Sequence, residues 1–125
     1  MGRKTLESFP DKKPLRNRTN IVLTTDVNYQ VEGATVVHSV EKLRKELEKY
    51  DTDNVYVIGG GSIYKTLLDD CDTALVTYID YEFDDADTFF PNLEEKPEWS
   101  LKAKSLKCVH AGMAYSFRTY EKDIA

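Results

Sequence analysis

The sequence predicts an α/β fold, with a mainly parallel sheet and an antiparallel hairpin at its carboxyl-terminal edge. Three observations predict it. Apolar, β-branched segments alternate with a helical pattern along most of the chain. The run "VYVIG" is apolar throughout, as in a strand that a parallel sheet buries on both faces. The last two segments alternate between polar and apolar residues and are joined by the short turn "AG".

Size and charge narrow the class of protein. The chain has 125 residues and a formal net charge of −5, which suits one domain and disfavours a nucleic-acid partner. No apolar run is long enough to span a bilayer, and the start "MGRKTLESF" lacks the apolar core of a signal peptide. Cys71 and Cys108 form no CxxC motif. We therefore expect a cytoplasmic protein with two free thiols and no membrane association.

The first half of the chain is expected to contain two helices and two strands. A pair of apolar residues three apart suits a short opening helix, and a loop with two prolines follows it. Val40, Leu43 and Leu47 share one face of a longer helix that Ser39 caps. The expected elements are a helix in 2–9, a loop in 10–18, strands in 19–25 and 34–39, and a helix in 39–50.

The second half is expected to contain the buried strand, one more helix, a long strand and the hairpin. The acidic stretch "DDAD" ends the long strand, and a loop leads from it to the hairpin. The expected elements are strands in 55–59 and 73–83, a helix in 62–71, a loop in 91–99, and hairpin strands in 100–110 and 113–122.

Three consecutive glycines, Gly59, Gly60 and Gly61, lie between the predicted buried strand and the helix that follows it. Such a turn exposes backbone N–H groups at the positive end of a helix dipole, and the missing Cβ atoms let phosphate or ribose approach. Ligands of open parallel sheets bind at this end of the strands. The turn therefore predicts a nucleotide site. A tight turn that needs positive φ is the alternative, although one glycine would satisfy it.

Several stretches resemble motifs of the dihydrofolate reductase family, in the family's order. They are "MGRKTLESFP", "PLRNRTNIVLT", "VIGGGSIY", "VTYID" and "ADTFFP", and the closing "YSFRTYEK" resembles the family's last strand. The similarity runs from Met1 to Lys122. It implies one dihydrofolate reductase domain over residues 1–125 and an oxidoreductase that reduces 7,8-dihydrofolate to tetrahydrofolate with NADPH.

The resemblance implies an NADPH site. Arg3 matches the residue near the adenosine 2′-phosphate, and the glycine turn, where the family has a cis Gly–Gly bond, matches the turn beneath the diphosphate and nicotinamide ribose. Ser62 stands where some bacterial relatives have arginine, which predicts a weaker preference for NADPH, and Lys4 and Asp26 also differ from common family residues. The implied cofactor-binding residues are Gly2, Arg3, Thr5, Thr24, Thr25, Gly59, Gly60, Gly61, Ser62, Ile63 and Tyr64.

The resemblance also implies a site for dihydrofolate, which antifolate inhibitors would share. Arg18 matches the arginine that pairs with the glutamate-tail carboxylate. Thr77 matches the threonine that supports the catalytic acid and the pterin amino group, and Tyr64 lies where pterin and nicotinamide meet. The implied substrate-binding residues are Ser8, Phe9, Leu15, Arg18, Ile58 and Thr77.

No residue of the chain matches the family's catalytic carboxylate, its lid loop or its central first strand. The carboxylates on or after the long strand lie at the wrong place in the family's order. We therefore expect an incomplete domain that lacks the N-terminal central strand and has negligible turnover alone. A swapped strand, a second copy in a homodimer, or a separate amino-terminal fragment is expected to fill the resulting slot.

Two other functions stay open. The first is a non-catalytic fragment that binds nucleotide or assembles with itself. The second is the reductase domain of riboflavin synthesis, which shares the glycine turn but which "ADTFFP" and "PLRNR" disfavour. Cys108 and His110 form a C-x-H pair, and "DDAD" is acidic, but neither has the spacing of a zinc or calcium site. We expect no metal.

Overall fold

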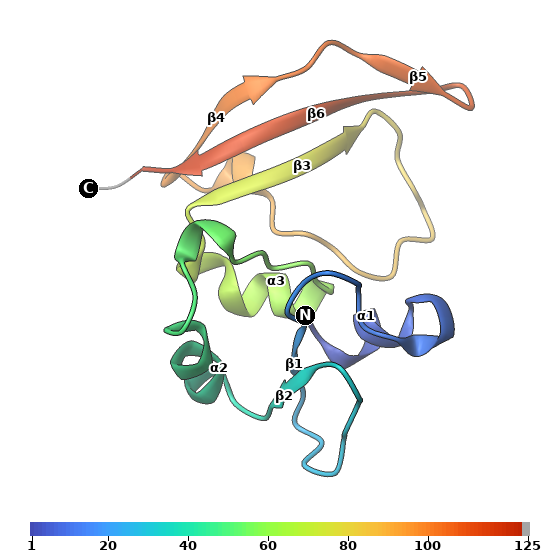
Figure 1. Cartoon of the computed structure of the whole chain (residues 1–125). Coiled ribbons are helices and arrows are strands. Elements are labelled where there is room, and N and C mark those ends of the chain that lie inside the picture. The colour runs from blue at the N-terminus through green and yellow to red at the C-terminus, as the bar shows by residue number, and fades with distance from the viewer. Residues whose placement is uncertain (124–125) are drawn as a thin grey trace. The chain divides into compact units, whose positions relative to one another are not determined.

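The computed structural model describes residues 1–123, which form two compact units, one ending at Tyr64 and one beginning at Lys65. Each unit has its own sheet, and together they contain the expected parallel and antiparallel strands (Figure 1). The predicted α/β class with parallel and antiparallel strands is confirmed, but the antiparallel strands form a sheet of their own and outnumber the parallel pair. No helix among residues 1–123 is long and apolar enough to cross a bilayer.

The first unit is built around a small parallel sheet. β1 and β2 pair with Val22 opposite Val36, and Val22 is completely buried. The predicted cap of α2 is confirmed, because Ser39 Oγ accepts a hydrogen bond of 3.1 Å from the Lys42 amide. The elements of this unit are α1 (Arg3–Glu7), η1 (Pro10–Lys12), β1 (Ile21–Leu23), β2 (Thr35–Val37), α2 (Val40–Leu47), η2 (Thr52–Asn54) and the first turn of α3 (Gly61–Leu67).

The first two residues connect β1 to the glycine turn. The Leu23 amide donates to the Met1 carbonyl at 2.9 Å, and Gly2 forms a parallel bridge with Leu23. On its other side, the Gly2 amide donates to the Gly59 carbonyl at 2.8 Å. The start of α1 is therefore fixed between β1 and the turn that the sequence singles out.

The prediction of a doubly buried strand at 55–59 is wrong. Val55 has extended dihedral angles, but residues 55–58 pair with no strand of the described chain, and Tyr56 is 71% exposed. A strand needs neighbours that accept and donate its backbone hydrogen bonds. The segment has a local bond from the Val55 amide to the Thr52 carbonyl at 3.2 Å and the bond from the Gly2 amide to the Gly59 carbonyl at 2.8 Å, neither of which is part of a strand ladder, so an apolar composition alone does not make it part of a sheet.

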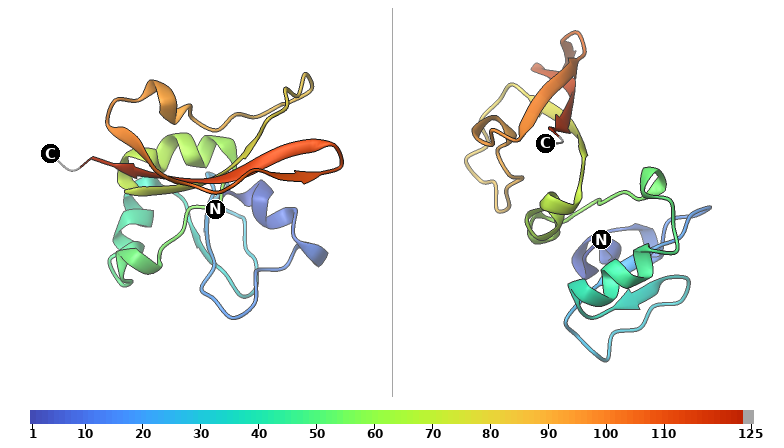
Figure 2. Two further views of the ribbon diagram at one scale, coloured as in Figure 1. Left: turned by 90° about the horizontal axis from the view of Figure 1, so that it is seen from above. Right: turned by 90° about the vertical axis from the view of Figure 1, so that its left-hand side faces the viewer.

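The second unit contains a four-stranded antiparallel sheet. Its strand order is β3–β6–β4, and β5 also pairs with β6. The left view of Figure 2 shows β6 as one long bent ribbon. Thr77 of β3 lies opposite Phe117 of β6. The elements are the end of α3, η3 (Leu68–Asp70), β3 (Thr73–Ile79), η4 (Leu93–Glu95), β4 (Trp99–Lys104), β5 (Cys108–His110) and β6 (Met113–Lys122).

Two predicted strands of the second unit are shorter than expected, as are the strands predicted at 19–25 and 34–39 in the first unit. β3 ends at Ile79 instead of reaching Phe83, because the Tyr81 amide turns back to the Ile79 carbonyl at 2.9 Å. The segment 100–110 is interrupted: a register shift follows Leu101, and residues 105–107 leave the ladder. The predicted "AG" turn is confirmed, since Ala111 and Gly112 have φ of 52° and 77°, as a two-residue hairpin turn requires.

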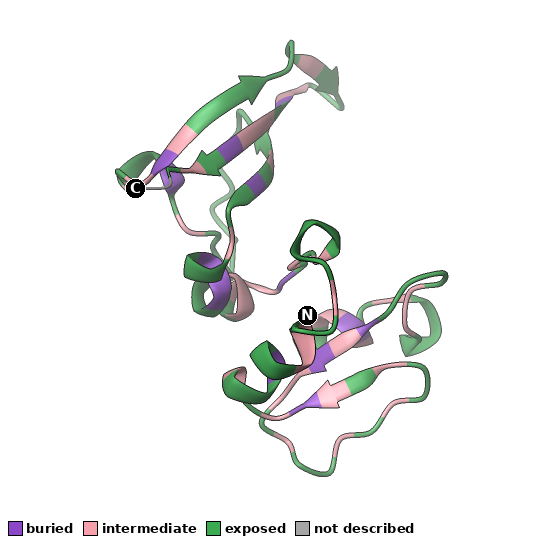
Figure 3. Ribbon diagram, turned by 60° about the vertical axis from the view of Figure 1, so that its left-hand side comes forward, coloured by how far each residue is buried: buried purple, intermediate pink, exposed green. Residues whose placement is uncertain are grey.

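One face of this sheet carries the core and the other is open. Leu68, Ala74, Leu93, Trp99 and Tyr120 form the buried cluster. Most of β4 is exposed, as Figure 3 shows. On the open face, Leu75 is 72% exposed and Phe117 is 54% exposed. The second unit therefore presents large apolar side chains that its own residues do not cover.

Candidate functional site

The glycine turn has little room for side chains. The peptide bond between Gly59 and Gly60 is cis, as the family resemblance implies, and Gly59 has a φ of 109°. A Cβ atom on Gly59 would lie 3.1 Å from Cε2 of Tyr64, and one on Gly60 would lie 3.6 Å from Thr5 Oγ1. Positive φ and the tyrosine ring together require glycine at position 59.

The start of α1 packs against the same turn. Gly2 is the residue before the helix, and a Cβ atom there would lie 3.1 Å from Cγ1 of Ile63. The Tyr64 amide donates to the Gly60 carbonyl at 3.0 Å, which begins α3. The structure therefore brings six of the predicted cofactor-binding residues together. They are Gly2, Thr5, Gly59, Gly60, Ile63 and Tyr64.

Arg3, the predicted phosphate ligand, has three partners in the first unit. Its Nε donates to Glu7 Oε1 at 2.7 Å, and its Nη1 donates to Asp26 Oδ2 at 3.0 Å. The guanidinium carbon lies 4.7 Å from the centre of the Tyr29 ring. The hydrogen bond with Glu7 is the main reason why the pKa of Arg3 is raised and the pKa of Glu7 is lowered. An arriving phosphate therefore has to share this guanidinium with two carboxylates.

The remaining predicted cofactor residues have different surroundings. Thr24 Oγ1 accepts from the Asp26 amide at 3.2 Å, so this hydroxyl stabilises the turn that presents Asp26. Thr25 is exposed. Ser62 is exposed in the first turn of α3, directly after Gly61.

The predicted substrate residues of the first unit lie on α1, in the loop after it, and before the glycine turn. Ser8 Oγ donates to the Thr5 carbonyl at 2.6 Å, Phe9 is half-buried, and Ile58 is 39% exposed. Arg18 is exposed, and its Nε donates to the Arg16 carbonyl at 2.8 Å.

Asn20 fixes the loop that carries Leu15 and Arg18. It is 5% exposed, and its Oδ1 accepts from the Leu15 amide at 3.0 Å. Its Nδ2 donates to the carbonyls of Leu15 and Arg18 at 2.9 and 3.1 Å. This residue is not among those predicted from the sequence. Its signal is an asparagine directly before a strand, where a side-chain amide can replace missing backbone partners.

Thr77 lies in the second unit, on β3, with an exposed side chain. No group of three or more histidine, cysteine or acidic side chains within residues 1–123 could hold a metal ion, and Cys71 and Cys108 are free thiols.

The comparisons with known proteins point to one family. The family model described as "Dihydrofolate reductase" matches residues 1–122. A dihydrofolate reductase of Heliothis virescens is 35% identical over 98% of this chain and 71% of its own length. One of Staphylococcus aureus is 41% identical over 73% of this chain, and the match covers 52%, about half, of that relative.

A solved structure is also similar over almost the whole chain. It is a dihydrofolate reductase from Enterococcus faecalis complexed with NADP(H) and RAB-propyl. The TM-score is 0.80 and the sequence identity is 37%, and the match covers 98% of this chain and 72% of that one.

Proposed function

Since the chain belongs to the dihydrofolate reductase family, we propose that it forms part of an NADPH-dependent enzyme that reduces 7,8-dihydrofolate to tetrahydrofolate. One observation carries the proposal at the level of the site. A bare glycine turn, the start of α1 and the Arg3 guanidinium belong to one compact unit, joined through the bond from Gly2 to Gly59. A dinucleotide phosphate needs both a backbone that it can approach and a cation.

The residues present fit this cofactor. NADPH, when bound, supplies the hydride. Gly59 is buried against the Tyr64 ring, whereas Gly60 and Gly61 are half-buried, so the backbone of these two residues, beside the Thr5 hydroxyl, is proposed to meet the cofactor. Arg3 is proposed to hold the 2′-phosphate, with Thr24, Thr25 and Ser62 as further hydroxyl donors.

We propose that the loop before β1 recognises the substrate. Asn20 fixes the backbone of Leu15 and Arg18, and the Nε atom of Arg18 is held by the Arg16 carbonyl. The terminal nitrogens of Arg18 are then oriented for a carboxylate, which guanidinium groups bind through two parallel hydrogen bonds. Phe9 and Leu15 offer apolar contacts to the benzoyl ring, with Ser8, Ile58 and Tyr64 as the other proposed contacts of the first unit. The role of Thr77, on β3 of the second unit, stays a prediction from the resemblance. Antifolate inhibitors are expected to use the same residues.

The test measures ligand binding and turnover separately on the 125-residue chain. We expect saturable NADPH binding by fluorescence titration and saturable dihydrofolate binding by calorimetry. Arg18→Gln should weaken only dihydrofolate binding, whereas the matched variant Arg16→Gln, at an exposed neighbouring arginine, should leave it unchanged. The proposal would be contradicted if Arg18→Gln bound both ligands as tightly as the parent chain, or if the parent chain bound neither ligand.

Turnover is a separate expectation. We expect negligible NADPH oxidation with dihydrofolate by this chain alone, because none of its residues matches the family's proton-donating carboxylate. Normal turnover would contradict that expectation while supporting the family activity. A ribosylaminopyrimidine substrate serves as the control for the riboflavin-pathway alternative.

The two free thiols agree with the cytoplasmic location that we propose.

A second candidate function is self-association. Leu75, Ile79 and Phe117 are exposed on the open face of β3 and β6, and β3 pairs only with β6 among the described strands. An unpaired edge next to an apolar face is a surface on which a second copy can add. Sedimentation equilibrium should show a dimer that Leu75→Lys weakens, and a chain that is monomeric at high concentration would exclude this candidate.

A further inference from the structure

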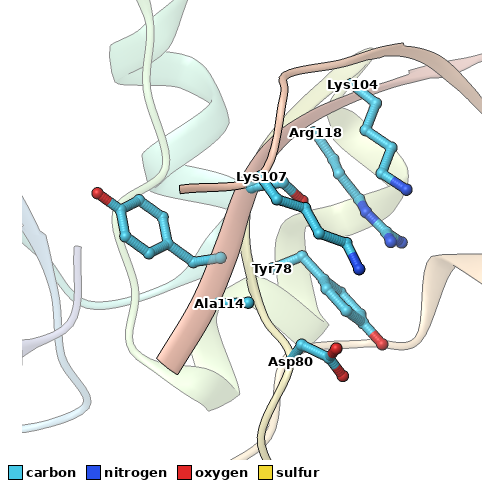
Figure 4. A pocket seen from close by; sticks show the side chains of 8 residues that line it. Tyr78, Asp80, Lys104, Lys107, Ala114 and Arg118 are labelled. Atoms are coloured by element: carbon cyan, nitrogen blue, oxygen red, sulfur yellow. The ribbon is translucent and has the colours of Figure 1, made fainter. Parts of the chain in front are cut away.

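The second unit contains a cavity of about 180 Å³ on its antiparallel sheet. Three cationic side chains, one carboxylate and three hydroxyl-bearing side chains line it, and Figure 4 shows the cationic groups extending to the same side. The residues that matter here are Tyr78, Asp80, Lys104, Lys107, Ser116 and Arg118. None of them is among the residues that the proposed reaction uses.

Two of these cations are placed against each other by the strand register. Lys104 of β4 lies directly opposite Arg118 of β6. Like charges directly opposite each other destabilise an antiparallel pair, and Lys107 adds a third positive charge to the same cavity. Among residues 1–123, the salt bridges include neither lysine. The positive charge is therefore only partly compensated, by Asp80 and by Glu94, whose Oε1 is 3.6 Å from Arg118 Nη1.

Arg118 is held in place before any ligand arrives. Its side chain is 15% exposed, its guanidinium carbon lies 3.8 Å from the centre of the Tyr78 ring, and its Nη1 donates to the Tyr120 hydroxyl at 3.3 Å. Its Nε is buried and has no hydrogen-bond partner within the described chain. A buried donor without a partner is costly, which favours a water molecule or an anion that accepts from it.

Hydrogen bonds hold the loop between β4 and β5 against β6 at Ser105, next to Lys104. The Ser105 amide donates to the Phe117 carbonyl at 2.8 Å, and the Phe117 amide donates back to Ser105 Oγ at 2.8 Å. The same hydroxyl donates to the Leu106 carbonyl at 3.0 Å. These bonds fix the backbone between Lys104 and Lys107 against β6.

We propose that this cavity binds a small tetrahedral oxyanion of the phosphate class. A dianion would relieve the repulsion between the opposed cations, and it suits a fixed arginine fork flanked by two lysine charges. The cavity of about 180 Å³ is smaller than the roughly 300–1,000 Å³ of sites for drug-sized ligands, so it suits a single phosphate group and not a dinucleotide. All of its lining residues belong to the second unit, whereas Arg3 and the glycine turn belong to the first.

The test is a titration of the ¹⁵N-labelled chain with inorganic phosphate at constant ionic strength, with chloride as the compensating anion. The amide signals of Ser116 and Arg118 should shift and saturate. In Lys104→Gln/Lys107→Gln, the dissociation constant should rise by at least about tenfold, because two charge-assisted contacts are lost. In Asp80→Asn it should fall several-fold, because a repelling carboxylate is removed.

A matched double variant controls for net charge. Lys42 and Lys45 are exposed on α2 in the first unit, and Lys42→Gln/Lys45→Gln should leave the phosphate response of Ser116 and Arg118 unchanged. Equal weakening in both double variants would mean general charge attraction and would overturn the proposal. So would shifts that increase linearly without saturating, or a response of the first unit alone.

Discussion

Asp26 is predicted to set the preference of the proposed site between NADPH and NADH. Its carboxylate holds Arg3 Nη1 at 3.0 Å, on the guanidinium that is proposed to receive the 2′-phosphate. Both side chains of this pair are about 40% exposed, at 43% and 42%, so an incoming phosphate can reach the guanidinium. Asp26→Asn should strengthen NADPH binding and leave NADH binding unchanged, since NADH has no 2′-phosphate.

The magnitude follows from the shared guanidinium. Two anions bound to the same guanidinium lie about 4–6 Å apart, and two like unit charges at 4 Å repel each other by about 1 kcal/mol in water. A phosphomonoester carries a charge of about −1.5 to −2. The removed repulsion is then about 1–2 kcal/mol, which corresponds to a change of about 5- to 30-fold in the dissociation constant. The substitution keeps the turn, because an asparagine oxygen can still accept from the Asn28 amide as Asp26 Oδ1 does at 3.0 Å.

The assay is a fluorescence titration with both cofactors at low and at high salt. The gain for NADPH should shrink at high salt, because screening weakens interactions between exposed charges. Glu48→Gln, which removes one exposed negative charge from the end of α2, is the control for net charge. Equal gains for NADPH and NADH in Asp26→Asn, or no gain at low salt, would refute the reasoning.

Three further predictions concern the turn, the core and one thiol. Gly59→Ala should reduce NADPH affinity by at least about tenfold, because the new methyl group meets a φ of 109° and a ring atom at 3.1 Å; unchanged affinity by titration would count against the site. Leu6→Ala should lower the free energy of unfolding by about 2–5 kcal/mol in urea denaturation, since Leu6 is fully buried, whereas Leu106→Ala, at a residue 90% exposed, should change it by less than about 0.5 kcal/mol. Burial raises the pKa of the Cys71 thiol. In the variant Cys108→Ser, where Cys71 is the remaining thiol, the reaction of Cys71 with a disulfide reagent at pH 8 should be slower in the folded chain than in urea. The stability that this thiol contributes is present below its ordinary pKa and is lost as pH rises through the raised value. Equal folded and unfolded rates at pH 8 would contradict this.

Local signals predicted the elements that local interactions determine. The Ser39 cap, the "AG" turn and the ten residues of β6 are all where the sequence places them. The cap and the turn each depend on a side chain or a backbone conformation within a few residues, whereas β6 also needs its partners β3 and β4. The cis bond at Gly59 was implied by the resemblance, not by spacing.

Interactions between distant residues explain the predictions that failed. Whether 55–58 forms a strand depends on partners elsewhere in the chain, and apolar composition does not identify them. The contact between Arg3 and Asp26 also joins residues far apart in sequence, so the charge that surrounds the proposed phosphate ligand became visible only in the fold. By contrast, the bond from Arg3 to Glu7 has i,i+4 spacing and was predictable in principle.

The pairing of β6 has a consequence for how the protein is made. β3, β4 and β5 all hydrogen-bond to β6, which leaves the ribosome after each of them. During synthesis, the first unit can close its short-range parallel pair while the second still waits for its shared strand. The nascent chain therefore has to keep the side chains that pack with Tyr120 of β6, such as Leu68 and Trp99, from aggregating until β6 has been made.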